Sequence, residues 1–254
     1  MTNKLKYFIG NWKMFGDFGD FKIISKINKF SYRSKNILKK RKIVLCVPST
    51  LIHSFKKKLI SKFISLGVQN CHHHEGYGPF TGSLSAKMLK NAGAEYIIIG
   101  HSENRSEGES NKLLKKKIAS ALNQKLNVIF CIGEKLFEKK RKKTFFVLKK
   151  QIKESIEKNF NMNKIIIAYE PVWSIGTNKI PKVDELRNAI RFIKINFKKN
   201  FKTNKYPKVL YGGSVNSNNI KLFSSISEID GFLIGGASQS SKKFIDIVKK
   251  YYKK

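Results

Sequence analysis

The sequence has few acidic residues, few cysteines and few prolines. Among its 254 residues there are 17 Asp and Glu, 3 Cys and 5 Pro. The cysteines, Cys46, Cys71 and Cys131, form no CxxC pair and no even set, so the sequence shows no disulfide framework and we expect a reducing compartment. No Pro/Ser-rich linker divides the chain, and we expect residues 1–254 to form a single domain.

Long apolar stretches are missing as well. No run of about 18 apolar residues occurs, so a membrane span is not expected. The chain runs from Met1 into a strand-like segment and shows no apolar core of a signal peptide. These absences predict a cytoplasmic protein with no membrane partner.

Positive charge is abundant by contrast. The 52 Lys and Arg give a net charge of +35, which is compatible with nucleic-acid binding, with attraction of an anionic substrate or with drift in composition. The lysines are spread over every expected helix, and no RRM, KH, zinc-finger or homeodomain pattern is present. We therefore favour drift and expect no specific nucleic-acid partner. The positive field would still speed the arrival of a phosphorylated substrate, less so in high salt.

Short apolar segments alternate with longer amphipathic segments along the whole chain. Eight such strand–helix units of roughly 30 residues predict a parallel sheet closed into a (β/α)8 barrel, with a doubly wound open sheet as the alternative. The expected strands are 6–10, 43–47, 66–70, 96–100, 128–132, 165–169, 209–211 and 231–234. The expected helices are 20–30, 51–64, 85–92, 111–123, 143–158, 183–197, 218–223 and 241–252, with Asp184, Asn111 and Ser241 as N-caps.

The carboxyl ends of the expected strands carry most of the residues suited to chemistry. In a barrel these ends meet on one face, where active sites form. An apolar strand ends at the carboxylate Glu170, and His101 follows another strand, so both are candidates for acid–base work. Asn11 and Lys13 follow the first strand and, by alternation, point to one side while Trp12 points to the other. The alternatives are a solvated carboxylate in a turn and a structural histidine.

Two Gly-Gly pairs follow the last two expected strands. Gly212-Gly213 and Gly235-Gly236 each lead into a short helix and leave bare backbone N–H groups for an anion. The loops after strands seven and eight form the usual phosphate site of barrel enzymes. The two pairs together therefore predict a phosphate site.

Three other loops have distinctive compositions. The loop that starts at Pro171 has an apolar middle and contains Gly176, which is typical of a lid, although a static packed loop is the alternative. The loop from Gly78 to Ser83 presents an aromatic residue between glycines, as partner-binding loops do. His72 to His74 offer metal ligands, but neighbours on an extended segment alternate sides and no second ligand cluster faces them, so we favour a surface loop without a metal.

In combination and in order, these motifs resemble those of the triosephosphate isomerase family. The resemblance implies a TIM barrel, with eight parallel strands ringed by helices, and a role in glycolysis and gluconeogenesis. It also implies reversible interconversion of dihydroxyacetone phosphate and D-glyceraldehyde 3-phosphate by proton transfer through an enediolate, under a closing lid loop. The matching stretches are Asn11-Trp12-Lys13, 100–103, 168–173, Gly176-Thr177, 211–215 and 235–238.

The same resemblance implies a role for each site residue. Glu170 is the implied general base, and His101, kept neutral, the implied donor to the carbonyl oxygen. Lys13 is implied to stabilise the negative charge of the enediolate, and Asn11 to help place the oxygen. No metal or organic cofactor is implied. The implied phosphate-binding groups are the backbone N–H groups of Gly176, Ser214, Gly235 and Gly236.

The family is usually a homodimer formed through the loop that is Gly78 to Ser83 here, with Thr81 approaching the partner's Asn11. Many members have Glu and Arg where this chain has Ser83 and Asn104, and those two charges can pair across the interface. Because both charges are absent, neither is left buried alone, and we expect the interface to survive through a polar contact.

The lid also departs from the family pattern. Asn178 stands where the family commonly has Gly, and Pro181 stands where the closed lid donates a backbone N–H to the Tyr211 hydroxyl. Proline has no N–H, so that latch cannot form. We expect a shifted balance between open and closed lid, or a substitute contact.

Two other functions remain as alternatives. One is a basic, non-enzymatic binding protein on a barrel scaffold, and the other is a different phosphate-sugar isomerase on the same fold. The joint presence of Asn11, Lys13, His101 and Glu170 argues against both, because fold alone does not define function.

Overall fold

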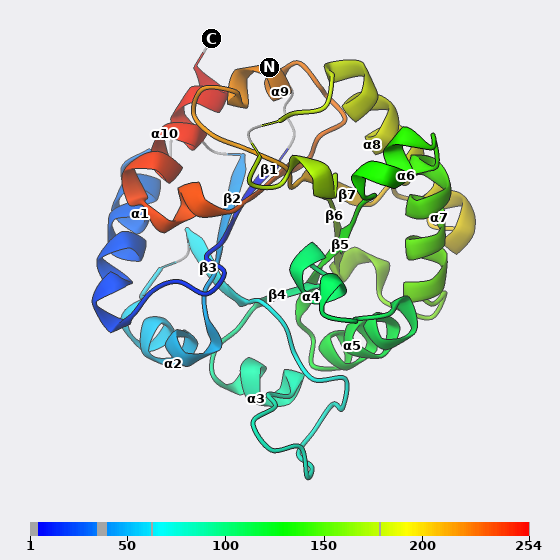
Figure 1. The fold of residues 1–254 in the computed structure, drawn as a ribbon. Helices are drawn as coiled ribbons and strands as arrows, with labels where there is room; N and C mark the ends of the chain where they lie inside the picture. Colours follow the sequence, from blue (N-terminus) through cyan, green and yellow to red (C-terminus); the bar gives the residue numbers. More distant parts are fainter. Residues whose placement is uncertain (1–4, 35–39, 62, 178, 254) are drawn as a thin grey trace.

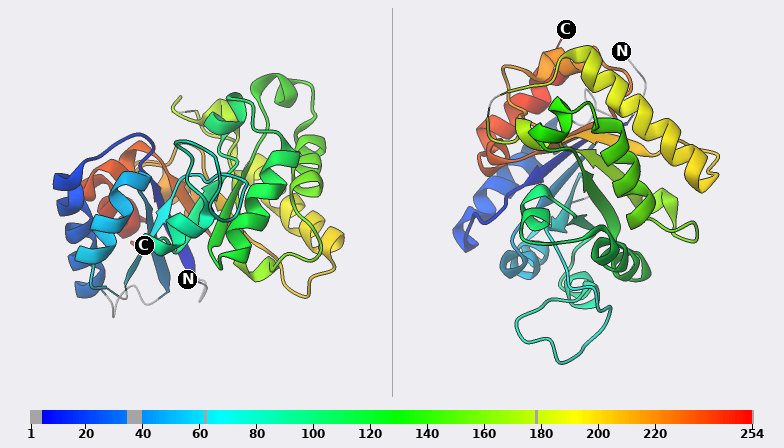
Figure 2. Two further views of the ribbon diagram at one scale, coloured as in Figure 1. Left: turned by 90° about the horizontal axis from the view of Figure 1, so that it is seen from below. Right: turned by 45° about the vertical axis from the view of Figure 1, so that its right-hand side comes forward.

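A computed structural model describes residues 5–34, 40–61, 63–177 and 179–253. Its eight strands form a closed parallel barrel in sequence order, and β1 (Lys6–Asn11) is hydrogen-bonded to both β2 (Arg41–Cys46) and β8 (Gly231–Ile234). The strands form the central ring and the helices surround it (Figures 1 and 2). The closed barrel confirms the predicted fold and excludes the open sheet.

The predicted strands and helices follow one another in the predicted order, and two short helices, Ser102–Ser106 and Leu136–Lys140, lie outside the prediction. None of the described helices is long and apolar enough to cross a membrane. The remaining strands are β3 Ile64–Val68, β4 Tyr96–Ile99, β5 Asn127–Ile132, β6 Ile165–Tyr169 and β7 Lys208–Tyr211. The α-helices are α1 Phe21–Arg33, α2 Ser49–Lys58, α3 Ala86–Asn91, α4 Ser102–Ser106, α5 Asn111–Asn123, α6 Leu136–Lys140, α7 Thr144–Ser155, α8 Val183–Phe201, α9 Ile220–Ser224 and α10 Ser241–Tyr252. Short 3-10 helices are η1 Phe18–Asp20, η2 Met162–Lys164, η3 Val172–Ser174 and η4 Gly236–Gln239.

The predicted N-caps are wrong. Ser110 and Ser240 have the extended backbone that a cap requires, and their hydroxyls accept the N–H groups of the first turns of α5 and α10. Asn111 and Ser241, one position later, are therefore already helical. α8 begins without a side-chain cap, and Asp184 lies in its first turn.

The largest error in a predicted boundary lies between α2 and β3. Ile64 was predicted to end a helix, but α2 ends at Lys58, where Leu59 turns to an extended backbone. The strand thus begins and ends two residues before the predicted 66–70.

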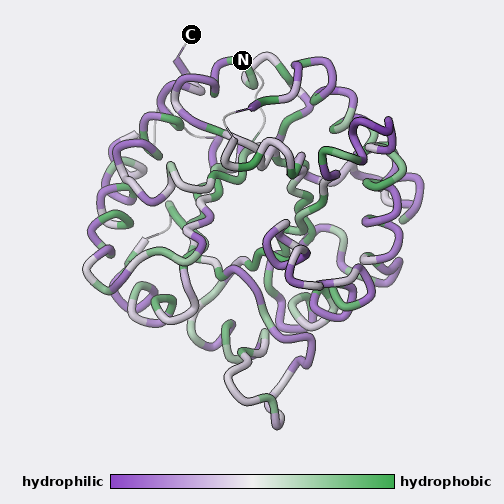
Figure 3. Tube along the Cα trace, in the orientation of Figure 1, coloured by the Kyte–Doolittle hydropathy of each residue, from purple (hydrophilic) through white to green (hydrophobic). Residues whose placement is uncertain are grey.

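Two apolar layers make up the core. Outward-facing strand residues pack against the helices, while the inward-facing residues fill the barrel. Figure 3 shows the apolar ring of strands and the polar outer surfaces of the helices. The interior layer consists of Ile9, Val44, Cys46, Tyr96, Ile98, Ile129, Cys131, Ile166, Ala168, Leu210 and Leu233.

Candidate active site

Strand alternation decides which residues reach the barrel mouth. Ala168 and Ile9 face the interior, so Glu170 and Asn11, two positions later, face it as well. Trp12 has the opposite direction and is fully buried in the layer beneath the helices. The predicted alternation around Trp12 is therefore confirmed.

A cavity of about 250 Å³ lies at this end of the barrel. It is smaller than the ~300–1,000 Å³ of pockets for drug-sized ligands. All eight predicted site residues line it, together with residues of the loops after β6, β7 and β8. These eight are Asn11, Lys13, His101, Glu170, Gly176, Ser214, Gly235 and Gly236.

Glu170 is the buried acid of the cavity, with 3% of its surface exposed. Its Oε1 lies 3.3 Å from His101 Nε2. Burial raises the pKa of Glu170 above its usual value, although His101, the Cys131 thiol and Lys13 oppose this rise. A carboxylate held out of water in this way is a stronger base than a solvated one.

His101 is held in one tautomer by the backbone. It follows Gly100, which has φ +74°, and caps α4: its Nδ1 accepts the Glu103 N–H at 3.3 Å. A nitrogen that accepts a hydrogen bond carries no proton, so the neutral ring carries its proton on Nε2, the atom nearest Glu170. The imidazole is thus set to donate a hydrogen bond into the cavity.

Lys13 has a left-handed backbone, with φ +57°. Its N–H donates to Asn11 Oδ1 at 3.0 Å, and its Nζ lies 2.5 Å from Glu103 Oε1. For a residue with a side chain this conformation costs on the order of 1 kcal/mol and is typical of functional sites. The ion pair with Glu103 holds the ammonium at the cavity, a contact that the sequence did not reveal.

Glu134, two residues after β5, is a buried anchor with 1% of its surface exposed. It accepts the Trp173 Nε1–H at 2.9 Å and the Tyr169 hydroxyl at 3.1 Å. Burial raises the pKa of Glu134, and the bonds from Trp173 and Tyr169 oppose the rise. Lys139 Nζ lies 3.8 Å from the centre of the Trp173 ring. The start of the lid loop, defined here as residues 171–179, is therefore held on α6.

Pro181 has no backbone N–H to donate to the Tyr211 hydroxyl, but this hydroxyl has another partner. It lies 3.2 Å from Ser174 Oγ, within the lid loop. Burial raises the pKa of Tyr211 to about 12, so the hydroxyl keeps its proton at neutral pH. A substitute contact in the closed lid stays a prediction, although Ser174 already pairs with the Tyr211 hydroxyl here. Asn178 lies outside the described residues.

The two Gly-Gly pairs differ in their surroundings. A Cβ at Gly236 would meet nothing within 4 Å, and one at Gly235 would meet only Lys13 Cε at 3.8 Å. A Cβ at Gly212 would lie 2.8 Å from Glu170 Cγ, and one at Gly213 would lie 2.3 Å from the Tyr211 hydroxyl. Open backbone is therefore found at the second pair, whereas the first pair makes room for side chains.

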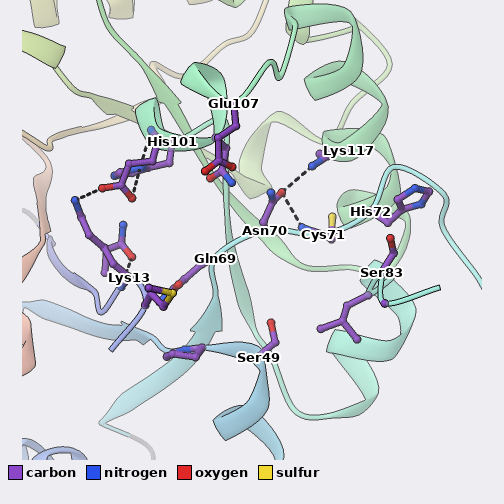
Figure 4. Close-up of a pocket in the computed structure, with 17 residues that line it drawn as sticks. Lys13, Ser49, Gln69, Asn70, Cys71, His72, Ser83, His101, Glu107 and Lys117 are labelled. Atoms are coloured by element: carbon purple, nitrogen blue, oxygen red, sulfur yellow. Dashed lines mark hydrogen bonds and ion pairs between the residues drawn. The ribbon is translucent and has the colours of Figure 1, made fainter. Parts of the chain in front are cut away.

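A larger cavity of about 570 Å³ adjoins the first and shares Asn11, Lys13 and His101 with it. Ser83 and Asn104, the two departures from the family pattern, both line it. Figure 4 shows Lys13 and His101 at one end and His72, Ser83 and Lys117 at the other. The loop that contains residues 78–83 projects away from the barrel beside α3 (Figure 1).

The three adjacent histidines pack within this projecting loop. The His72 ring lies 4.2 Å from that of His73 and 4.4 Å from that of Phe80, and His74 Nε2 lies 3.0 Å from Tyr77 O. Phe80 is exposed as predicted, although the His72 and His74 rings pack against it, and Tyr77 is the more exposed aromatic. Within the described part of the chain, no three His, Cys, Asp or Glu side chains are grouped to hold a metal.

A buried carboxylate 3.3 Å from an imidazole donor is arranged to move protons, and the open glycine backbone nearby is arranged to hold an anion. Fold and site together define a barrel enzyme of the acid–base class with a small anionic substrate. A family model described as triosephosphate isomerase matches residues 6–251. The chain therefore belongs to the triosephosphate isomerase family.

Individual relatives support this membership over the full length. The triosephosphate isomerase of Dictyoglomus thermophilum is 41% identical over 96% of this chain and 98% of its own. That of Mycoplasmopsis pulmonis is 37% identical over 94% and 95%. The crystal structure of triosephosphate isomerase from Bartonella henselae superposes with a TM-score of 0.88 at 35% identity, covering 98% of this chain and 99% of that one.

Proposed function

We propose that Glu170 is the general base with which this protein, a triosephosphate isomerase by its family, interconverts dihydroxyacetone phosphate and D-glyceraldehyde 3-phosphate. The chain is an intramolecular aldose–ketose isomerase by its family, in glycolysis and gluconeogenesis. The observation that carries the assignment of the base is the buried Glu170 carboxylate, 3.3 Å from His101 Nε2 in a cavity bounded by open glycine backbone.

The proton moves between adjacent carbons of the substrate. Glu170 removes a proton from C1 of dihydroxyacetone phosphate while the His101 Nε2–H donates to the C2 oxygen, which gives an enediolate. Glu170 then returns the proton to C2. His101 gives its Nε2 proton to the C2 oxygen and takes the proton of the C1 hydroxyl, so that the C1 oxygen becomes the aldehyde and the C2 oxygen the hydroxyl. Lys13 stabilises the negative charge and Asn11 positions the oxygen; one such preorganised donor can be worth about 3 kcal/mol.

The phosphate would lie on the backbone N–H groups at the other end of the cavity. Closure of the lid loop over it would exclude water and keep the enediolate from losing its phosphate. Every proton in this scheme moves between chain and substrate, so we propose no metal or organic cofactor. The proposed phosphate contacts are Gly176, Ser214, Gly235 and Gly236.

We further propose a cytoplasmic homodimer of single-domain chains. The projecting loop from Gly78 to Ser83 would enter the larger cavity of the partner, beside Asn11 and Lys13. Ser83 and Asn104 would meet there as neutral polar groups in place of an ion pair. Sedimentation should give twice the 29.2 kDa mass of the chain, and a monomer at micromolar concentration would contradict the proposal.

Turnover of glyceraldehyde 3-phosphate, with a chelator present and at two salt concentrations, tests the reaction. We expect rapid turnover that the chelator leaves unchanged, with a lower rate at high salt if the +35 charge steers the substrate. A folded protein without turnover would overturn the proposed function.

A further inference from the structure

Ser174 lies four residues after Glu170 in the lid loop and is fully buried. Its Oγ has three polar neighbours in three different segments. They are Lys179 O at 2.7 Å, the Tyr211 hydroxyl at 3.2 Å and the Ser214 N at 3.4 Å. One short side chain thus joins both ends of the lid loop to the segment that follows β7.

The donors and acceptors of this cluster match. A hydroxyl has one hydrogen to donate and two lone pairs to accept with. The Ser174 O–H donates to the Lys179 carbonyl, while Tyr211 O–H and Ser214 N–H donate to Ser174 Oγ. The hydrogen-bonding capacity of this buried hydroxyl is fully used.

The neighbouring glycines make room for the cluster. A Cβ at Gly213 would lie 2.3 Å from the Tyr211 hydroxyl and 2.7 Å from Ser174 Oγ, so no other residue fits there without displacing the hydroxyl pair. Gly212, one residue earlier, packs against Glu170 Cγ. Ser174 and Glu170 therefore both pack against the Gly212-Gly213 segment.

We propose that Ser174 is a positioning residue whose hydroxyl couples phosphate binding to the position of the lid loop and of Glu170. The inference rests on the proposed function, in which the Ser214 N–H holds the substrate phosphate. The same N–H donates to Ser174 Oγ in the free protein. A phosphate that takes this N–H changes the bonding of a side chain four residues from the base.

The test is a cycle of Ser174→Ala, Tyr211→Phe and the double variant. Ser174→Ala should lower kcat about fivefold to tenfold, the effect of one hydrogen bond. The inhibition constant for inorganic phosphate should fall about twofold to fivefold, because the Ser214 N–H no longer donates to Ser174 Oγ in the free protein. The double variant should lose no more than the larger single loss, since both changes break the same contact. A kcat within twofold of the parent for Ser174→Ala, or losses that multiply in the double variant, would overturn the proposal.

Ser155→Ala is the matched control. Ser155 on α7 is also fully buried, but its hydroxyl has no partner among the described residues. Its removal should leave kcat and KM within twofold of the parent. An equal loss in Ser155→Ala and Ser174→Ala would assign the effect to lost packing and overturn the proposal.

Hydrogen exchange separates this proposal from the proposed function, because it needs no turnover. In the substrate-free protein, the amide of Ser214 should exchange faster in Ser174→Ala than in the parent. Unchanged exchange with an active parent enzyme would overturn only the role of Ser174. An inactive parent would overturn the proposed function, whatever the exchange shows.

Discussion

The two Gly-Gly pairs at the barrel mouth are identical in sequence but have opposite surroundings. Gly235 and Gly236 border open space, whereas Gly212 and Gly213 are pressed against Glu170 and the Tyr211 hydroxyl. Both pairs follow neighbouring strands, β7 and β8, and both line the same cavity. A glycine pair at a strand end can therefore leave open backbone, where we propose that the phosphate binds, or make space for a neighbouring side chain.

The difference follows from what lies beside each pair. β7 is paired with β6, whose carboxyl end carries Glu170 and the lid loop, so that side chains from β6 fill the space next to Gly212. β8 is paired with β1, whose end carries Asn11 and Lys13 beside the cavity. The comparison predicts that substitutions in the two pairs affect different kinetic constants.

Replacement of Glu170, the side chain on which Gly212 packs, should have the largest effect. Glu170→Gln keeps the shape that contacts Gly212 but removes the base, so kcat should fall about a thousandfold while KM changes little. An isomerase rate within tenfold of the parent would show that another group is the base.

The ionisation of Glu170 should also make the stability of the protein depend on pH. Its pKa is raised by burial, so the folded protein binds that proton more tightly than the unfolded chain does. This contribution to stability is present at pH below the usual carboxyl value of about 4.5 and is lost as the pH rises through the raised pKa. Glu170→Gln should therefore have a higher Tm than the parent at pH 7, and the difference should shrink towards pH 4.

The raised pKa of Glu170 should also appear in the kinetics. As the pH falls, kcat/KM of the parent should decrease with a midpoint above the usual carboxyl pKa of about 4.5.

Gly212→Ala should give the next largest effect. The added methyl group would lie 2.8 Å from Glu170 Cγ and must move the base. A displacement of about 1 Å can lower kcat about a hundredfold. Steady-state kinetics should show this loss with KM changed less than fivefold. A rise in KM with kcat preserved would mean that Gly212 serves phosphate and not the base.

Gly236→Ala should act on binding instead. The methyl group meets no protein atom within 4 Å, so Tm should be unchanged. It would occupy space intended for the phosphate, and KM should rise about tenfold with a smaller change in kcat. If Gly236→Ala and Gly212→Ala changed the same constant by the same factor, the contrast between the two pairs would be lost.

Lys139→Met should have the smallest effect. It removes the ammonium that lies 3.8 Å from the Trp173 ring centre but keeps an unbranched side chain there. A cation–π contact at a partly exposed site is worth about 0.5–1 kcal/mol, so kcat/KM should fall about twofold to fivefold. Lys140→Met, on the same helix, is the control and should leave kcat/KM unchanged.

Much of the molecule follows from local pattern. The apolar runs and helical periods predict eight strand–helix units, and period two alone directs Asn11 and Glu170 into the barrel mouth. The errors at Asn111 and Ser241 arise because a cap needs an extended backbone at one particular residue, which composition does not specify. The error at Ile64 arises because α2 ends at Lys58, although the apolar residues continue into β3.

The sequence by itself determined the eight strand–helix units, the residues at the strand ends and the resemblance to the family, because strand period and motif order are properties of neighbouring residues. The tertiary structure decided between the closed barrel and the open sheet. Only the tertiary structure decided that Glu134 anchors Trp173, that Ser174 meets Tyr211, and that the first glycine pair packs against Glu170. These contacts join the segments at the carboxyl ends of different strands. Their distances depend on how the closed barrel brings the strand ends together, and no local pattern encodes that.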